Sequence, residues 1–280
     1  MKKPVLLLLV FWGWMSSCSS PTEVPVETAP LRLASFHGTA TELLFAMGMG
    51  ANIVVRDVTS SYPEAAAVIP SVGHPNQITA EPVLAYAPDV VICTELLKTE
   101  VREAFKAAGA EVILLPNPDT PENGKVCLDV LSKRFGADAA QITTQFACFE
   151  QPDQTRQNAP TALFVYGHPG NSGWMVAGSE TAVSQVLSLG GFRNPAAELS
   201  GFNPLTPEAL VAYNPDYIVL FDHTFESLGG IDGLLVVPGM AETTAGARQQ
   251  ILHFPGQAMN GFGLQTCEII NRLQHISRPS

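Results

Sequence analysis

Four of the six histidines in this 280-residue chain lie beside segments that the sequence predicts to be buried strands. His37 follows LRLASF, His168 follows ALFVYG, His223 follows YIVLFD, and His74 lies in the loop sequence VGHPNQ. Imidazole is a common ligand of iron, zinc and copper, so the pattern suggests a metal or metal-complex site without choosing the metal. A histidine between a strand and a helix can instead satisfy the helix end, and His37 is the main candidate for that role.

Motifs that would indicate an enzyme are absent. The chain has no G-x-S-x-G, no G-x-x-x-x-G-K, no H-E-x-x-H and no G-x-G-x-x-G after a predicted strand. Asp57 and Asp222 at strand ends could act as acids or bases, but nothing pairs either with a nucleophile. We therefore expect a binding protein and not an enzyme.

The elements that position these residues occur twice. The segment ITAEPVLAYAPDVV from Ile78 matches LTPEALVAYNPDYI from Leu205 at one offset, 208 − 81 = 127 residues. Each copy reads as a Thr cap, a short apolar helix, a Pro-Asp stop and an apolar strand. A weaker pair, GTATELLFAMGMG from Gly38 and GSETAVSQVLSLGG from Gly178, precedes it. The order predicts two lobes of one plan, although any two αβ units can share a Thr cap and a Pro stop.

The predicted fold is α/β, with two Rossmann-like lobes that carry parallel sheets and are joined by a single long helix. The expected N-terminal lobe spans residues 31–123, the connecting helical segment 124–159 and the C-terminal lobe 160–280. Ligands of open parallel sheets bind outside the carboxyl ends of the strands. The ligand cleft is therefore expected between the lobes, where the four histidines would lie.

The N-terminus has the pattern of an export signal. Lys2 and Lys3 precede the apolar run Val5–Trp14, and Met-Ser-Ser follows directly before Cys18. This pattern resembles a bacterial lipoprotein signal over residues 1–18, with Cys18 as the acylated residue; an ordinary secretory peptide is the alternative. Residues 19–30 read as a flexible tether. We expect a periplasmic protein that is anchored to a membrane through Cys18.

Composition limits the partners. The net charge is −11 and no Lys/Arg cluster occurs, which argues against a nucleic acid partner. The four cysteines after Cys18 show no metal-binding spacing, and the sequence alone does not pair them. Glu81 and Glu208 each lie in a predicted first helical turn, where the helix dipole favours a carboxylate. Their matched placement also suits docking to a two-fold partner that presents Arg or Lys.

Seven segments resemble a known family, in order: RDVTSSYP, IPSVG, ITAEPVLA, GSETAVSQVLSLGG, LTPEALVAYNPD, FESLGGIDGLLVVPGMAETTAG and NGFG. The family is the periplasmic haem-binding proteins of bacterial haem-uptake ABC importers, and the resemblance covers about Leu31 to His275. It implies two αβ lobes joined by one long helix with little closure. It also implies that Glu81 and Glu208 dock onto arginines of the permease dimer.

The resemblance implies a ligand set that departs from the family pattern. The usual axial tyrosine after the VG pair is here His74, and the arginine that often follows the second-lobe strand is here His223. His168 matches a histidine that is the other ligand in some members. The resemblance therefore implies haem iron held by His74, with His168 as sixth ligand or distal neighbour. His223 and His37 would lie near the ligands, with Tyr62 as a reserve phenolate.

Three functions compete. In the first, the protein captures haem between apolar walls and delivers it to an importer. Trp174, Met175, Phe202 and Phe262 could contribute to these walls or could equally be core residues. In the second, it transports cobalamin, a ferric siderophore or a metal ion; Arg56 is a candidate partner for an anionic siderophore. In the third, an enzyme or chaperone acts on haem at the same cleft.

Overall fold

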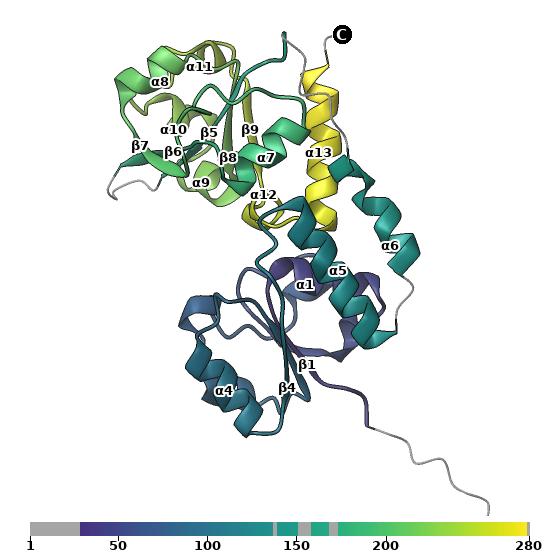
Figure 1. The fold of residues 1–280 in the computed structure, drawn as a ribbon. Coiled ribbons are helices and arrows are strands. Elements are labelled where there is room, and N and C mark those ends of the chain that lie inside the picture. Colours follow the sequence, from purple (N-terminus) through teal and green to yellow (C-terminus); the bar gives the residue numbers. More distant parts are fainter. Residues whose placement is uncertain (1–28, 137–138, 151–157, 168–172, 279–280) are drawn as a thin grey trace, which may run out of the picture. The chain divides into compact units, whose positions relative to one another are not determined.

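The computed structural model describes residues 29–136, 139–150, 158–167 and 173–278, and Leu31–Ser280 form one compact unit. The predicted signal segment, nearly all of the tether and His168 lie outside the described residues. Two β-sheets, one in the first half of this unit and one in the second, form two lobes (Figure 1). The predicted α/β two-lobe fold is confirmed.

The first sheet has four parallel strands in the order β2-β1-β3-β4. Every residue of β1 (LASF) and of β3 (VVIC) is buried, as expected for central strands of a parallel sheet that is covered on both faces. The strands are β1 Leu33–Phe36, β2 Ile53–Arg56, β3 Val90–Cys93 and β4 Glu111–Leu114. The helices of this lobe are α1 Gly38–Ala46, η1 Gly50–Asn52, α2 Glu64–Ala67, η2 Pro75–Gln77, α3 Ala80–Leu84 and α4 Thr99–Ala107.

The connection between the sheets is helical but not one helix. Helix α5 (Pro121–Phe135) begins at Thr120, whose side chain accepts a hydrogen bond from the Asn123 amide at 3.2 Å, and ends at Gly136 in the left-handed conformation (φ 68°). The chain continues as α6 Ala139–Gln145 and the 3-10 helix η3 Phe146–Glu150. The single long helix expected to join the lobes is divided into three helices in the structure. The longest helix of the connection precedes Gly136, because that residue ends α5.

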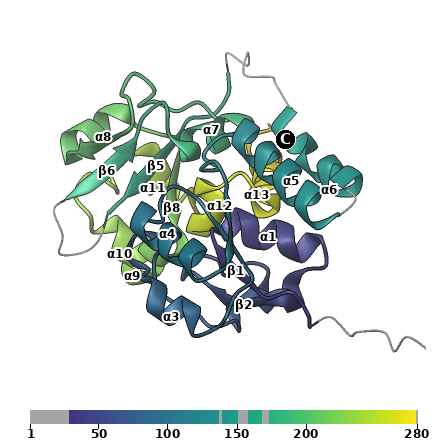
Figure 2. The same ribbon diagram turned by 60° about the horizontal axis from the view of Figure 1, so that its bottom comes forward.

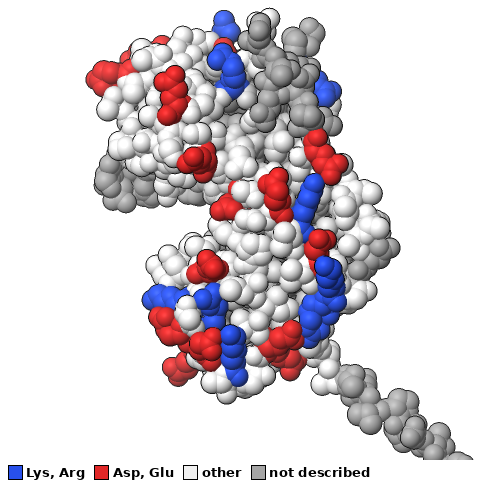
Figure 3. Space-filling view, viewed as in Figure 1, with Lys and Arg blue, Asp and Glu red and all other residues white. Residues whose placement is uncertain are grey.

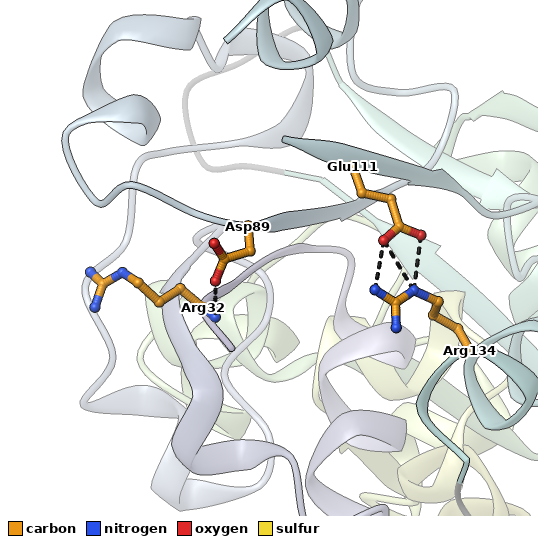
Figure 4. Close-up of polar contacts among 4 residues, drawn as sticks. All are labelled: Arg32, Asp89, Glu111 and Arg134. Carbon is orange, nitrogen blue, oxygen red and sulfur yellow. Dashed lines mark hydrogen bonds and ion pairs between the residues drawn. The ribbon is translucent and has the colours of Figure 1, made fainter. Parts of the chain in front are cut away.

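A paired ion contact holds α5 to the first sheet. The Arg134 guanidinium donates to both carboxylate oxygens of Glu111 in β4, at 2.6–3.0 Å (Figure 4). This bond holds the pKa of the Glu111 carboxyl below its usual range. Helix α5 also packs beside α1 and α6 (Figures 1 and 2), so α5 belongs to the body of the first lobe.

The second sheet has five strands in the order β7-β6-β5-β8-β9. Strands β5, β8 and β9 are parallel, whereas β6 pairs antiparallel with both β5 and β7. The expectation of a wholly parallel sheet was wrong here, because residues 167–173 are too few for a crossover connection. The strands are β5 Ala162–Tyr166, β6 Trp174–Ala177, β7 Phe202–Leu205, β8 Tyr217–Phe221 and β9 Ile251–Phe254. The helices are α7 Ala182–Leu189, α8 Pro207–Tyr213, α9 Asp222–Ser227, α10 Ile231–Leu235, α11 Thr244–Ala247, α12 Gly256–Asn260 and α13 Leu264–Ser277.

Each sheet packs one face into a core of its own and the other face into a core that both lobes share. The outer faces bury separate clusters, one around Phe105 of α4 and one around Leu220 of β8. The other face of each sheet packs into a single cluster that runs from Leu44 of α1 through Leu131 of α5 to Ile270 of α13. Because moving one lobe against the other would expose this shared core, the structure favours lobes that move little.

The repeated Pro-Asp stop has the same structural role in both lobes. Helix α8 ends at Asn214 in the left-handed conformation (φ 39°), and Ala87 (φ 43°), at the matching position, follows shortly after the end of α3. The Asp89 carboxylate then accepts a hydrogen bond from the Arg32 amide at 2.8 Å, just before β1 (Figure 4). Its counterpart Asp216 accepts from the Thr161 amide and hydroxyl, each at 2.8 Å, just before β5. Each repeated aspartate therefore ties the start of one parallel strand to its neighbour.

One disulfide joins the connection to the last helix. Cys148 in η3 is bonded to Cys267 in α13 at a sequence separation of 119, while Cys93 and Cys127 are buried thiols. Such a bond suits an oxidising compartment. Among the described helices, none has the length and apolar character to cross a membrane.

Candidate functional site

The carboxyl ends of the two sheets face each other. Helix α12 follows β9, and its Gln257 donates through Nε2 to the Glu42 carboxylate of α1, the helix that follows β1. Gln257 Oε1 also accepts from the Ser61 amide, in the loop after β2, at 3.3 Å. Beyond these contacts the surface is deeply hollowed between the two lobes (Figure 3). This hollow is the cleft that the strand order predicts for a ligand.

His37 caps a helix. It is half-buried at the carboxyl end of β1, and its Nδ1 accepts a hydrogen bond from the Thr39 amide at 3.2 Å. Burial lowers the pKa of His37 to about 4, against the opposing effect of Asp57 and Asp119, so the ring is neutral at physiological pH. The structure thus gives His37 the helix-end role that the sequence left open, and only Nε2 is left for another partner.

His74 is poised to offer a lone pair. It is exposed in the loop after β2, directly before η2, and its Nδ1 lies 2.8 Å from Asn76 Oδ1. Asn76 Oδ1 can only accept, so this contact suits the neutral tautomer in which Nδ1 donates and the Nε2 lone pair is left for a ligand. Histidines that bind metals usually donate their other ring N–H in this way.

Tyr62 is occupied elsewhere. Its hydroxyl donates to Glu268 Oε1 of α13 at 2.9 Å. Desolvation and this bond raise the pKa of Tyr62 to about 12, which disfavours the phenolate. The structure therefore gives no support to Tyr62 as a reserve iron ligand in this conformation.

Arg56 serves the loop that carries His74. It is buried at the end of β2, and its guanidinium donates to the backbone carbonyls of Asp57, Ala67 and Ile69 at 2.8–3.1 Å. These bonds use the planar fork of donors that would otherwise recognise an anionic ligand. Arg56 is thus a scaffold residue in this structure, which removes the cation expected for a siderophore.

His223 lies at the carboxyl end of β8, beside an aromatic residue that the sequence analysis overlooked. The exposed His223 ring stacks on Phe221 with centroids 5.4 Å apart and 23° between the planes. Tyr166, the last residue of β5, is 5.6 Å from Phe221 and 6.4 Å from His223. Tyr166 is 43% exposed. The signal for Tyr166 was its position directly before Gly167, at the end of a central strand.

The residues proposed for the apolar walls differ in burial. Trp174 and Met175 in β6 are half-buried, and Phe202 at the start of β7 is exposed. Phe262 is fully buried and packs its ring against Phe149 at 5.4 Å, so it is a core residue. His168 lies outside the described residues.

Glu81 and Glu208 are both exposed in the first turns of α3 and α8. Helix α8 is capped by Thr206, whose hydroxyl accepts from the Ala209 amide at 3.2 Å. A hydrogen bond from the Glu208 amide, and another from the Thr206 side chain, lower the pKa of the Glu208 carboxyl. The two glutamates thus present charged groups at matched positions of two lobes.

The described part of the chain holds no cluster of three or more His, Cys, Asp or Glu side chains suited to a metal ion. No Lys or Arg directly follows a parallel strand at the cleft edge; the residues there include Thr94, Leu115, Asp222 and Pro255. The geometry therefore disfavours a bare metal ion or an anionic chelate among the described residues.

Known proteins share this architecture. The family described as periplasmic binding protein matches residues 33–258. The chain belongs to this family. Because the family and its relatives are substrate-binding transport proteins, the expectation that the chain is not an enzyme is confirmed. Membership also supports a periplasmic location.

Solved structures and a curated relative add detail. A periplasmic haem-binding protein of Pseudomonas aeruginosa is 31% identical, with a TM-score of 0.79 over 90% of this chain and 94% of that one. The haem-binding protein HutB of Vibrio cholerae is 27% identical, with a TM-score of 0.79 over 90% and 100%. A vitamin B12-binding protein of Photorhabdus laumondii is 25% identical over 69% of this chain and 71% of its own length. The expected resemblance to periplasmic haem-binding proteins is confirmed.

Proposed function

We propose that this protein is a substrate-binding lipoprotein that captures haem between its lobes and delivers it to the permease of an ABC importer. The observation that carries the proposal is His74, whose Nε2 lone pair is available in the loop at the cleft. A neutral imidazole needs no neighbouring cation to lower its pKa, unlike a tyrosinate. His223 stands where relatives often have arginine, which agrees with an iron ligand that needs no neighbouring cation.

The other roles follow from position. His168 would be the sixth ligand or a distal neighbour, and His37 Nε2 would face the ligand from the first lobe. Cys18 would carry the lipid that keeps the protein at the membrane. Residues 19–30 would be the flexible link between this anchor and the two lobes. Glu81 and Glu208 would each meet an arginine of the permease dimer.

Hemin titration tests the proposal. Protein without residues 1–18 is titrated with hemin while the Soret band is followed, and a saturable shift to a sharp low-spin spectrum is expected. His74→Ala should weaken binding and change the spectrum, whereas His275→Ala, an exposed histidine of α13, should do neither. A broad spectrum like that of free hemin, without saturation, would refute haem capture.

Cobalamin is the second candidate, because the B12-binding relative matches most of the chain. The same titration with cobalamin separates the two. Saturable binding of cobalamin, with no saturable binding of hemin, would transfer the transport role to that ligand.

A further inference from the structure

Three rings form a corner at the carboxyl edge of the second sheet, which we call the aromatic corner: Tyr166, Phe221 and His223. His223 lies nearly parallel on Phe221, with 23° between the planes. Tyr166 stands at 68° to Phe221 and at 73° to His223. The corner therefore consists of a stacked platform and a ring that stands beside it as a wall.

The platform rests on rigid packing. Phe221 is buried and meets the ring of Phe164 at 4.7 Å, and both belong to the core that the lobes share. Phe164 in turn lies 6.5 Å from Phe202, which continues the aromatic surface to β7. Because Phe221 is held from below, the His223 ring above it has a defined support.

The outer side of the corner is unused. His223 is exposed even though Phe221 covers one face of its ring, so part of the side chain is open to solvent. The Tyr166 hydroxyl makes no hydrogen bond to any residue in the described segments, unlike the hydroxyl of Tyr62, which is bound to Glu268. A further aromatic ring can pack favourably against such rings, either stacked with an offset or edge to face.

The residues around the aromatic corner limit which ligand it can bind. The strand ends beside the corner carry no Lys or Arg, and the described residues offer no metal-holding cluster. A small anion or a free cation would therefore find little to bind. A flat, conjugated macrocycle would lay its face on His223 and its edge against Tyr166.

We propose that the aromatic corner binds the porphyrin ring itself, irrespective of the metal, so that the protein also takes metal-free porphyrin. This inference rests on the proposed function, because it assigns the second-lobe wall of the same cleft. It separates two kinds of contact. His74 would recognise the iron, and the aromatic corner would recognise the ring.

Metal-free protoporphyrin IX is the probe that separates these contacts. Its fluorescence is followed during titration of protein without residues 1–18, beside a parallel hemin titration. Wild-type protein should bind protoporphyrin IX saturably. His223→Leu and Tyr166→Leu should each weaken protoporphyrin IX by about 2- to 12-fold, the range expected for one aromatic pair. Tyr166→Phe keeps the ring and should bind as wild type does.

Control variants identify the contact. His74→Ala should weaken hemin but leave protoporphyrin IX unchanged, because the metal-free ring offers no iron to bind. His275→Leu, on the exposed face of α13, should change neither ligand. Since His223 is exposed, its substitution tests the corner without disturbing the core, even if a Tyr166 variant folds poorly.

Four outcomes overturn the inference. Hemin binding without protoporphyrin IX binding would refute it and leave the proposed function intact. Unchanged protoporphyrin IX affinity in His223→Leu would show that the platform is not the contact. Equal weakening by Tyr166→Phe and Tyr166→Leu would assign the effect to the hydroxyl and not to the ring. If neither ligand binds, the proposed function fails as well.

Discussion

Glu42 makes the stability of this protein depend on pH. Its side chain in α1 is almost fully buried, where it accepts hydrogen bonds from Gln257 Nε2 and from the Gln265 amide at 3.0 Å. Desolvation, with a smaller contribution from nearby Glu268, raises the pKa of Glu42 from 4.5 to about 7. The two bonds favour the charged form but do not offset the cost of burying it.

The sign and size follow from proton linkage. The folded state holds its proton more tightly than the unfolded chain, so the contribution of Glu42 is fully present below pH 4.5 and is lost as the pH rises through 7. Each unit of pKa corresponds to about 1.4 kcal/mol. Between pH 5 and pH 7.5 the free energy of unfolding should therefore fall by about 2 kcal/mol through this group.

Urea unfolding at pH 5 and pH 7.5 measures the effect. Glu42→Gln cannot titrate, so its free energy of unfolding should fall less over this range than that of the wild type, by about 2 kcal/mol. Glu95→Gln, at an exposed carboxylate, is the matched control and should behave as the wild type does. Equal pH dependence in Glu42→Gln and the wild type would refute the assignment of a raised pKa to this residue.

Three further predictions concern stability and transport. Replacing Cys148 and Cys267 together by serine should lower the free energy of unfolding by about 2–5 kcal/mol in urea melts, because the bond closes a long loop; a loss below about 1 kcal/mol would contradict its stabilising role. Asp216→Ala should cost about 1–3 kcal/mol by leaving the Thr161 amide without its acceptor, and an unchanged midpoint of thermal unfolding would count against this. Reversing the charge of Glu81 and Glu208 together should leave hemin affinity intact but abolish importer-dependent uptake in cells, and persistent uptake would reject the docking role.

Features that depend on residues close together in the chain could be predicted from the sequence. The matched segments around Glu81 and Glu208 identified both lobes, and the Pro-Asp stops were correctly placed before strands. The alternative role of His37 as a helix cap was also correct, because a side chain before a helix needs only its near neighbours to act.

Contacts between distant parts of the chain were beyond the sequence. Gln257 reaches Glu42 across 215 residues, and Cys148 pairs with Cys267, although no periodicity relates either pair. Tyr166 was overlooked because a tyrosine in an apolar strand reads as core until the strand order shows that it closes the strand at the cleft. For Phe262 the sequence left a wall position and a core position equally open, because only packing reveals that the side chain is enclosed.

The core that the two lobes share has a consequence for how an importer distinguishes a loaded protein from an empty one. Many binding proteins close around their ligand, so that the loaded protein presents a different surface to the transporter. Here such a movement would have to open part of the shared cluster that extends from Leu44 and Leu131 to Ile270, at a cost of about 1.5–3 kcal/mol for each large apolar side chain exposed. Empty and loaded protein would then present nearly the same docking faces and compete for the same transporter. The rate of import should therefore depend on the fraction of the protein that carries cargo, and an excess of empty protein should inhibit transport.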